Sequence, residues 1–107
     1  MIHVVYHKAY HRVTVKGHAQ SAEKGRDLVC AAASMLTSTL AANVAQLETK
    51  GIVQKKAIVL DDGCAEVSCT VPSKYKYTVD MIYLGVCTGF ELLSQRYPEY
   101  VTYEIRG

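Results

Sequence analysis

The sequence predicts an α+β fold, a two-layer sandwich in the order β-β-α-β-β-α-β with both helices on one face of the sheet. Three observations predict it. Residues 27–47 and 78–96 repeat apolar side chains at helical spacing, and five shorter segments have the composition of strands. The length of 107 residues, with 50% hydrophobic and 21% charged residues, suits one globular unit. We therefore expect a single domain over residues 1–107.

The first two strands are predicted at residues 2–7 and 10–16, joined by a two-residue connection at Lys8-Ala9. In that register residue 7 opposes residue 10, 6 opposes 11 and 4 opposes 13. The same alternation assigns a core face to this hairpin, made of Ile2, Val4, Tyr6, His11, Val13 and Val15.

A polar segment, residues 17–26, is expected to form a loop that leads into the first helix. Asp27 is the expected N-cap, the helix continues to about Leu47, and Gly51 closes it. Helical spacing predicts its apolar stripe as Leu28, Met35, Leu36, Leu40, Val44 and Leu47.

Residues 55–60 and 64–71 are predicted to form a second hairpin around the turn Asp61-Asp62-Gly63. A second helix is expected over residues 78–96, stopped by Pro98, and a last strand over 101–105. Gly85 and Gly89 give this helix a flat face for packing against the first helix. Its predicted apolar stripe is Val79, Ile82, Tyr83, Val86, Phe90 and Leu93.

Composition argues against several classes of protein. The net charge is only +2 and the basic residues are scattered, so direct nucleic-acid binding is not expected. The first residues are too short and polar for a signal peptide, and no stretch resembles a membrane span. We expect a cytoplasmic protein without membrane contact, in which all four cysteines remain thiols.

Histidines and cysteines in the strand segments suggest a metal site at first sight. Cys64 and Cys69 are an odd number of residues apart on one strand and face opposite sides of the sheet. His11 likewise faces away from His3 and His7. Surface histidines and packing cysteines are the better interpretation, as is packing for Cys87, and no metal or cofactor is expected.

Cys30 is the candidate nucleophile. A small apolar role on an alanine-rich helix is the ordinary interpretation of such a cysteine. Three features favour reactivity: a place near the third residue of a capped helix, a loop that can fold back, and His18 in that loop. Asp27 would oppose thiolate formation if ionised and close, and Ser34 lies one turn further on the same face. Both are candidates for a third member that orients His18.

Gly25 has two open interpretations, as an ordinary turn glycine or as the hinge of a lid that closes over an extended peptide. The small and polar residues around it motivate the lid.

The residues Gly17-His18-Ala19, then Gly25, then the run from Asp27 to Ser34 closely resemble the signature of the ribosomal-processing cysteine protease Prp family. The resemblance covers the whole chain in length and element order. It implies a homodimeric cytoplasmic protease that removes an N-terminal extension from bacterial large-subunit ribosomal protein twenty-seven, cutting after an apolar, Phe-rich stretch. It implies further that Cys30 is the nucleophile, that His18 is the general base or acid, and that the remaining matched residues shape the site: Gly17, Ala19, Gly25, Asp27 and Ser34.

The chemistry expected of such a site is acyl transfer. The Cys30 thiolate attacks the scissile carbonyl, His18 protonates the leaving amine, and water then hydrolyses the thioester. Backbone N–H groups at the helix start are expected to stabilise the oxyanion. A ribosome-associated module that binds a peptide without cutting it is the alternative. A thiol sensor is disfavoured, because the sequence has no C-x-x-C pair.

Overall fold

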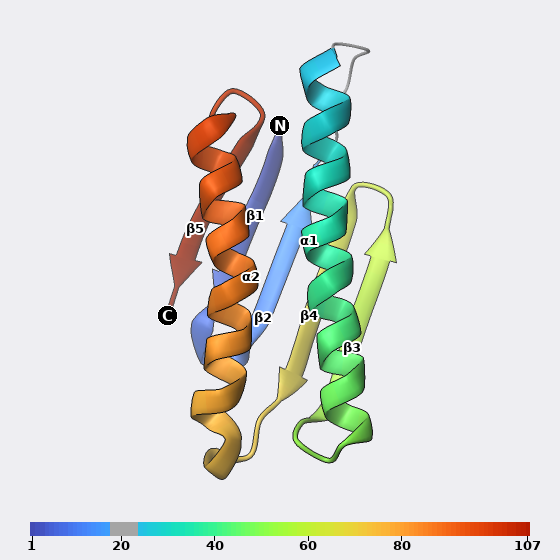
Figure 1. Cartoon of the computed structure of the whole chain (residues 1–107), viewed down its shortest axis with the longest axis vertical. Helices are drawn as coiled ribbons and strands as arrows, with labels where there is room; N and C mark the ends of the chain where they lie inside the picture. The colour runs from blue at the N-terminus through green and yellow to red at the C-terminus, as the bar shows by residue number, and fades with distance from the viewer. Residues whose placement is uncertain (18–23) are drawn as a thin grey trace.

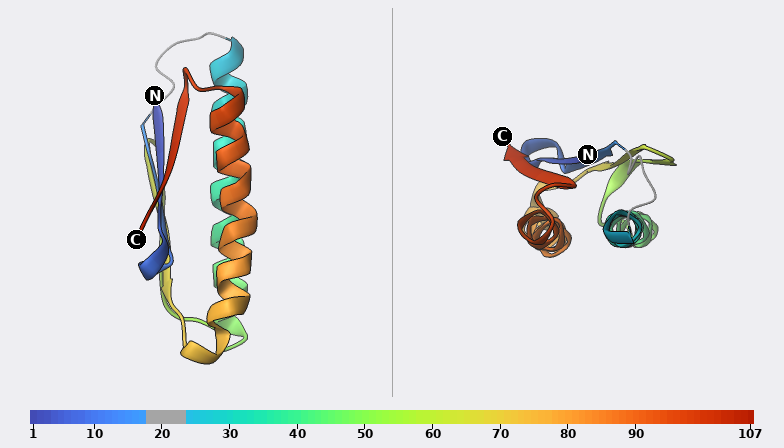
Figure 2. Two further views of the ribbon diagram at one scale, coloured as in Figure 1. Left: turned by 90° about the vertical axis from the view of Figure 1, so that its left-hand side faces the viewer. Right: turned by 90° about the horizontal axis from the view of Figure 1, so that it is seen from above.

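The computed structural model describes residues 1–17 and 28–107 in full, together with the backbone of 24–27. It has two layers, a five-stranded sheet and a pair of helices packed side by side on one of its faces (Figures 1 and 2). The predicted α+β sandwich is therefore confirmed. In chain order the elements are β1 (Ile2–His7), β2 (Arg12–Lys16), α1 (Lys24–Thr49), β3 (Gln54–Asp61), β4 (Cys64–Thr70), α2 (Lys76–Arg96) and β5 (Val101–Arg106), with short 3-10 turns η1 (Lys8–Tyr10) and η2 (Ser73–Tyr75).

The strand order across the sheet is β3-β4-β2-β1-β5. Neighbouring strands are antiparallel except β1 and β5, which run parallel and begin their pairing at Ile2 and Val101. The helix α2 connects β4 to β5, which lie in the same sheet but are separated by β2 and β1, so the connection crosses over the face of the sheet. The first strand is therefore an inner strand, covered on both edges.

The first hairpin has a different register from the one the sequence predicts. His7 pairs with Arg12 and Tyr6 with Val13, so the connection spans η1 and His11 rather than two residues. His11 adopts a left-handed conformation, with φ 47°. Because the register differs by two residues, every side chain keeps its face, and the predicted core face is confirmed: Ile2, Val4, Tyr6, His11 and Val13 are buried, and Val15 packs against them.

The helix α1 begins at Lys24, one turn earlier than predicted. Lysine and arginine have high helix propensity, which favours extending the helix through Lys24 and Arg26. Its predicted apolar stripe is confirmed for Leu36, Leu40, Val44 and Leu47, which lie in or against the core, and is wrong for two residues. These are Leu28 and Met35, which are exposed. The buried residues of α1 are Val29, Ala33, Thr37, Leu40, Ala41, Val44 and Leu47.

The second half of the chain follows the prediction closely. Asp61 pairs with Cys64, which leaves Asp62-Gly63 as a two-residue turn. The predicted stripe of α2 faces the core, with Val79, Tyr83, Val86 and Phe90 buried and Ile82 and Leu93 packed against them.

Close packing between the helices is confirmed at one of the two glycines and wrong at the other. A Cβ on Gly89 would lie 2.6 Å from Leu36 Cδ2, so this glycine lets α1 approach α2. A Cβ on Gly85 would meet open space.

The expectation that no stretch of the chain resembles a membrane span is wrong. Residues Leu28–Thr49 form a helix long and apolar enough to cross a membrane by length and composition, with a mean hydropathy of 1.6. The core helix of a globular protein passes the same test. Here the segment contributes Val29, Leu40 and Val44 to the core between the helices and the sheet.

Candidate active site

A cleft of about 330 Å³ opens between α1 and the strand ends at one end of the molecule. Small and polar side chains of α1 line one wall, among them Cys30, Ser34 and Ser38. The turn of the β3–β4 hairpin, residues 60–65, forms the opposite wall, and Ile2, Val15 and Gly17 complete the lining. The structure therefore brings Gly17, Cys30 and Ser34, three of the residues singled out in the sequence, to one cavity.

Cys30 is half-buried and lines this cleft, but its place in the helix differs from the expected one. It is the seventh residue of α1, counted from Lys24, rather than a residue of the first turn. The effect of a helix terminus falls off within the first turn, so it gives little support to a thiolate at this position. The unpaired N–H groups of a helix belong to its first four residues, so the expected role of the Cys30 amide as an oxyanion donor is not supported.

Gly17 occupies a position that only glycine fits. Its φ is +115°, and a Cβ there would overlap the carbonyl oxygen of Met1. Its N–H donates a hydrogen bond of 3.0 Å to the carbonyl of Gly63. Gly17 thus ties the end of β2 to the hairpin turn and to the start of the chain, which fixes the floor of the cleft.

Thr37 and Ser34 lie on the same side of α1 as Cys30. The Thr37 hydroxyl is buried and donates a 2.7 Å hydrogen bond to the carbonyl of Ala33, so it serves the helix. Ser34 lies one turn beyond Cys30 and borders the same cavity.

The remaining candidates divide into two groups. His18 and Ala19 lie outside the described residues. Gly25 lies within α1 rather than in a loop, so its interpretation as a turn or loop hinge is wrong. Asp27 is likewise a residue of α1 and not its N-cap, because the helix already begins three residues before it.

The other three cysteines differ from Cys30 in environment. Cys69 and Cys87 are buried, and burial raises the pKa of both thiols, that of Cys87 to about 11. The packing role predicted for Cys87 is confirmed by its place in the core. Cys64 is exposed at the rim of the cleft, but strand alternation places it on the opposite face from Ala65.

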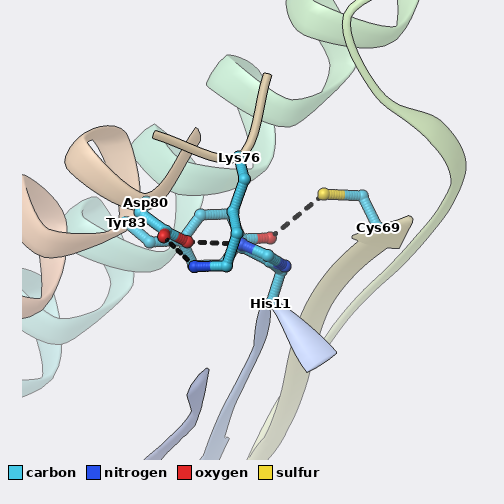
Figure 3. A network of polar contacts seen from close by, with 5 residues as sticks. All are labelled: His11, Cys69, Lys76, Asp80 and Tyr83. Carbon is cyan, nitrogen blue, oxygen red and sulfur yellow. Dashed lines mark hydrogen bonds and ion pairs between the residues drawn. The ribbon is translucent and has the colours of Figure 1, made fainter. Parts of the chain in front are cut away.

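A second polar cluster lies at the other end of the sheet, where η1 meets the start of α2 (Figure 3). The Nε2 of His11 donates to Asp80 at 2.6 Å, and Lys76 donates to the other carboxylate oxygen at 2.5 Å. Burial alone would raise the pKa of Asp80, but the hydrogen bonds and charges of Lys76 and His11 outweigh it and lower that pKa. Sequence reasoning placed His11 in the core and missed its partner, because Asp80 is 69 residues away along the chain.

Tyr83 completes this cluster. Its ring meets that of His11 edge to face, with centroids 5.6 Å apart, and its hydroxyl lies 3.6 Å from Cys69 Sγ. A cysteine with a raised pKa and a tyrosine partner is a poor nucleophile. The cluster therefore joins structural elements and does not form a second thiol site. Within the described part of the chain, no group of three or more His, Cys, Asp or Glu side chains could hold a metal ion.

Comparison with known protein families identifies the family to which the chain belongs. The family model for the cysteine protease Prp matches residues 1–102. The chain belongs to the Prp family of cysteine proteases. It is therefore an enzyme that hydrolyses peptide bonds through a thiol. A comparison with curated protein sequences finds no match.

Three solved structures resemble this Prp-family chain. SMU.848 from Streptococcus mutans is 27% identical, with a TM-score of 0.67 over 98% of this chain and 91% of that one. Two structures of the essential ribosomal processing protease Prp from S. aureus share the fold. One, in complex with a substrate peptide, is 17% identical, with a TM-score of 0.71 over 98% of this chain and 97% of that one. The other, with a covalently linked product peptide, is 20% identical, with a TM-score of 0.75 over 99% and 100%.

A Prp-family protease needs a thiol that a peptide can reach, and Cys30 meets that requirement. All four cysteines are free thiols within the described residues. Cys30 combines partial exposure with a place in the cleft on the helix-covered face, whereas Cys69 and Cys87 are buried.

Proposed function

We propose that this protein removes the N-terminal extension of bacterial large-subunit ribosomal protein twenty-seven through a Cys30–His18 dyad. The observation that carries the proposal is the position of Cys30, half-buried in an open cleft. Cys69 and Cys87 are buried, and Cys64, at the rim of the cleft, is turned to the opposite face of the sheet by strand alternation. The signature from Gly17 to Ser34 supports His18 as its partner. The S. aureus protease named above, with its substrate and covalently linked product peptides, supports ribosomal processing as the task.

In the proposed mechanism His18 takes the proton of the Cys30 thiol, and the thiolate attacks the scissile carbonyl. The tetrahedral intermediate collapses to a thioester as the protonated His18 gives its proton to the leaving amine. Water, deprotonated by His18, then hydrolyses the thioester and restores the thiol. Since Cys30 lies beyond the first turn of α1, the proposed mechanism assigns the activation of its thiol to His18 rather than to the helix terminus.

The same resemblance supports three further parts of the proposal. The protein acts as a homodimer, it works in the cytoplasm where its substrate is made, and Gly17, Ala19, Gly25, Asp27 and Ser34 shape the site. Gly17 and Ser34 border the cleft, which supports their role directly. The lid predicted over residues 18–27 falls mostly on residues 18–23, which lie outside the described residues, and residues 24–27 belong to α1.

The test uses a peptide that spans the extension and the mature start of the ribosomal protein, with products identified by mass spectrometry. We expect the wild type to cut once at the boundary and Cys30→Ala and His18→Ala to lose all turnover. Cys64→Ala is the matched control and should retain full activity, because Cys64 faces away from the helices. Turnover by Cys30→Ala would overturn the assignment of the nucleophile. A wild type that binds the peptide and never cuts it would instead indicate a binding module.

A further inference from the structure

Leu60 is an apolar side chain that faces the helix layer and yet remains 53% exposed. Its direction follows from the sheet register. Val4 lies in the core and pairs with Val15 across β1 and β2. Val15 pairs with Ala65 on β4, and Ala65 pairs with Leu60 on β3. Because directly opposed residues in a sheet share a face, Leu60 faces the helices.

Leu60 remains exposed because the side chains opposite it, on α1, are small. Where α1 passes over Leu60, the residues that line the cleft are small: Cys30, Ala33, Ser34, Thr37 and Ser38. These side chains do not fill the space above the sheet, and the cavity of about 330 Å³ results. By contrast Ile58, two residues earlier on the same face of β3, packs against the core.

The hairpin wall and the adjoining strands therefore present one apolar patch to the cleft, which the candidate nucleophile also lines. Ile2, Val15, Leu60 and Ala65 contribute apolar side chains to it. Leu60 is the largest of them that is exposed, so it has the most apolar surface to lose to a ligand. Exposed apolar surface inside a concave site is the usual mark of a pocket for an apolar group.

We infer that Leu60 is a specificity-determining residue, the floor of a subsite that receives the apolar side chain of the substrate residue just before the cut bond. This inference rests on the proposed function, in which cleavage follows an apolar stretch. Contact between that side chain and Leu60 would remove both side chains from water. It would also hold the carbonyl of the same substrate residue, the one that is attacked, beside Cys30. A charge in place of Leu60 should then change which peptides are cut.

The test compares two peptides that differ only in the residue before the cut, Phe in one and Lys in the other. We expect Leu60→Asp to lower kcat/KM for the Phe peptide by about tenfold or more, as for loss of several buried methylene groups. The same variant should raise kcat/KM for the Lys peptide above the wild-type value, because its carboxylate pairs with the ammonium group. Leu60→Met keeps an apolar floor and should stay within about threefold of the wild type for the Phe peptide.

Leu92→Asp is the matched control, since Leu92 on α2 is similarly exposed and does not line the cleft. It should leave both kcat/KM values unchanged, and thermal unfolding should show that each variant is folded. A Leu60→Asp enzyme with the wild-type preference for Phe over Lys would overturn the inference while leaving the proposed function intact. A folded wild type that cuts neither peptide would overturn the proposed function itself.

Discussion

Gly17 shows how one residue can fix the shape of the cleft around Cys30. Its backbone passes so close to Met1 that no side chain fits, and its φ of +115° is one that other residues rarely adopt. We expect Gly17→Ala to lower the free energy of unfolding by about 2 kcal/mol or more, from backbone strain and displacement of the chain start. Urea unfolding followed by circular dichroism measures this change.

Gly85→Ala is the control for that experiment. Gly85 lies inside α2, and a Cβ there would meet open space. The substitution should raise the free energy of unfolding by about 0.5–1 kcal/mol, because alanine is the better helix former. If Gly17→Ala had the same effect as Gly85→Ala, the close approach to Met1 would play no part in stability.

The link between η1 and α2 depends on one carboxylate. Asp80 accepts hydrogen bonds from His11 and Lys76, and its pKa is lowered despite partial burial. A lowered pKa means that the folded state favours the ionised form. Its contribution to stability is therefore present above the ordinary pKa of 3.8 and is lost as the pH falls through the lowered value.

We expect Asp80→Asn to lower the free energy of unfolding by about 1–2 kcal/mol near pH 6, since it removes a charge-assisted pair and leaves His11 poorly partnered. The difference in the free energy of unfolding between Asp80→Asn and the wild type should become smaller below about pH 4. Chemical unfolding at several pH values measures it. Glu104→Gln, which removes an exposed pair with Arg106, should leave the unfolding midpoint unchanged. A difference between wild type and Asp80→Asn that grew toward low pH would contradict the argument.

The elements were predictable where a local signal determines them. Asp62-Gly63 is a strong hairpin signal, and the register of β3 and β4 follows from it. The first hairpin has no such signal, because its left-handed residue is His11 rather than glycine or asparagine. Its faces were nevertheless predicted correctly, since an error of two residues keeps the alternation.

The start of α1 illustrates what local signals miss. Asp27 has the chemistry of an N-cap, but the residues before it also favour a helix, and the helix begins earlier. Because the helix does not begin at Asp27, Cys30 is not in its first turn. The helix terminus therefore does not stabilise the Cys30 thiolate as expected.

The candidate site was predictable only for the residues of the motif. The motif identifies Gly17, Cys30 and Ser34, and the structure places all three at one cavity. The hairpin wall was not predictable, because Leu60 reaches the cleft through pairing with β4 and β2, which no local pattern specifies. The pairing of His11 with Asp80 escaped prediction for the same reason.

The molecule depends on one core between the helices and the sheet. Phe90 is fully buried there beside Tyr83, Val79 and Leu40. We expect Phe90→Ala to cost about 3–5 kcal/mol, a large share of the roughly 5–15 kcal/mol by which small domains are stable. Thermal unfolding should show a large fall in Tm with a single cooperative transition. Leu92→Ala on the exposed side of α2 should stay within about 0.5 kcal/mol of the wild type, and an equal loss in both variants would contradict this location of the core.

The parallel pairing of β1 with β5 has a consequence for when the cleft forms during folding. The N–H of Ile2, a residue of the cleft floor, donates to the carbonyl of Tyr100, and β1 pairs along its length with residues 101–106. The partner of Ile2 in the sheet, Val101, is distant along the chain, and such long-range pairings form slowly. The floor of the cleft is therefore completed late in folding, when β5 docks on the open edge of β1.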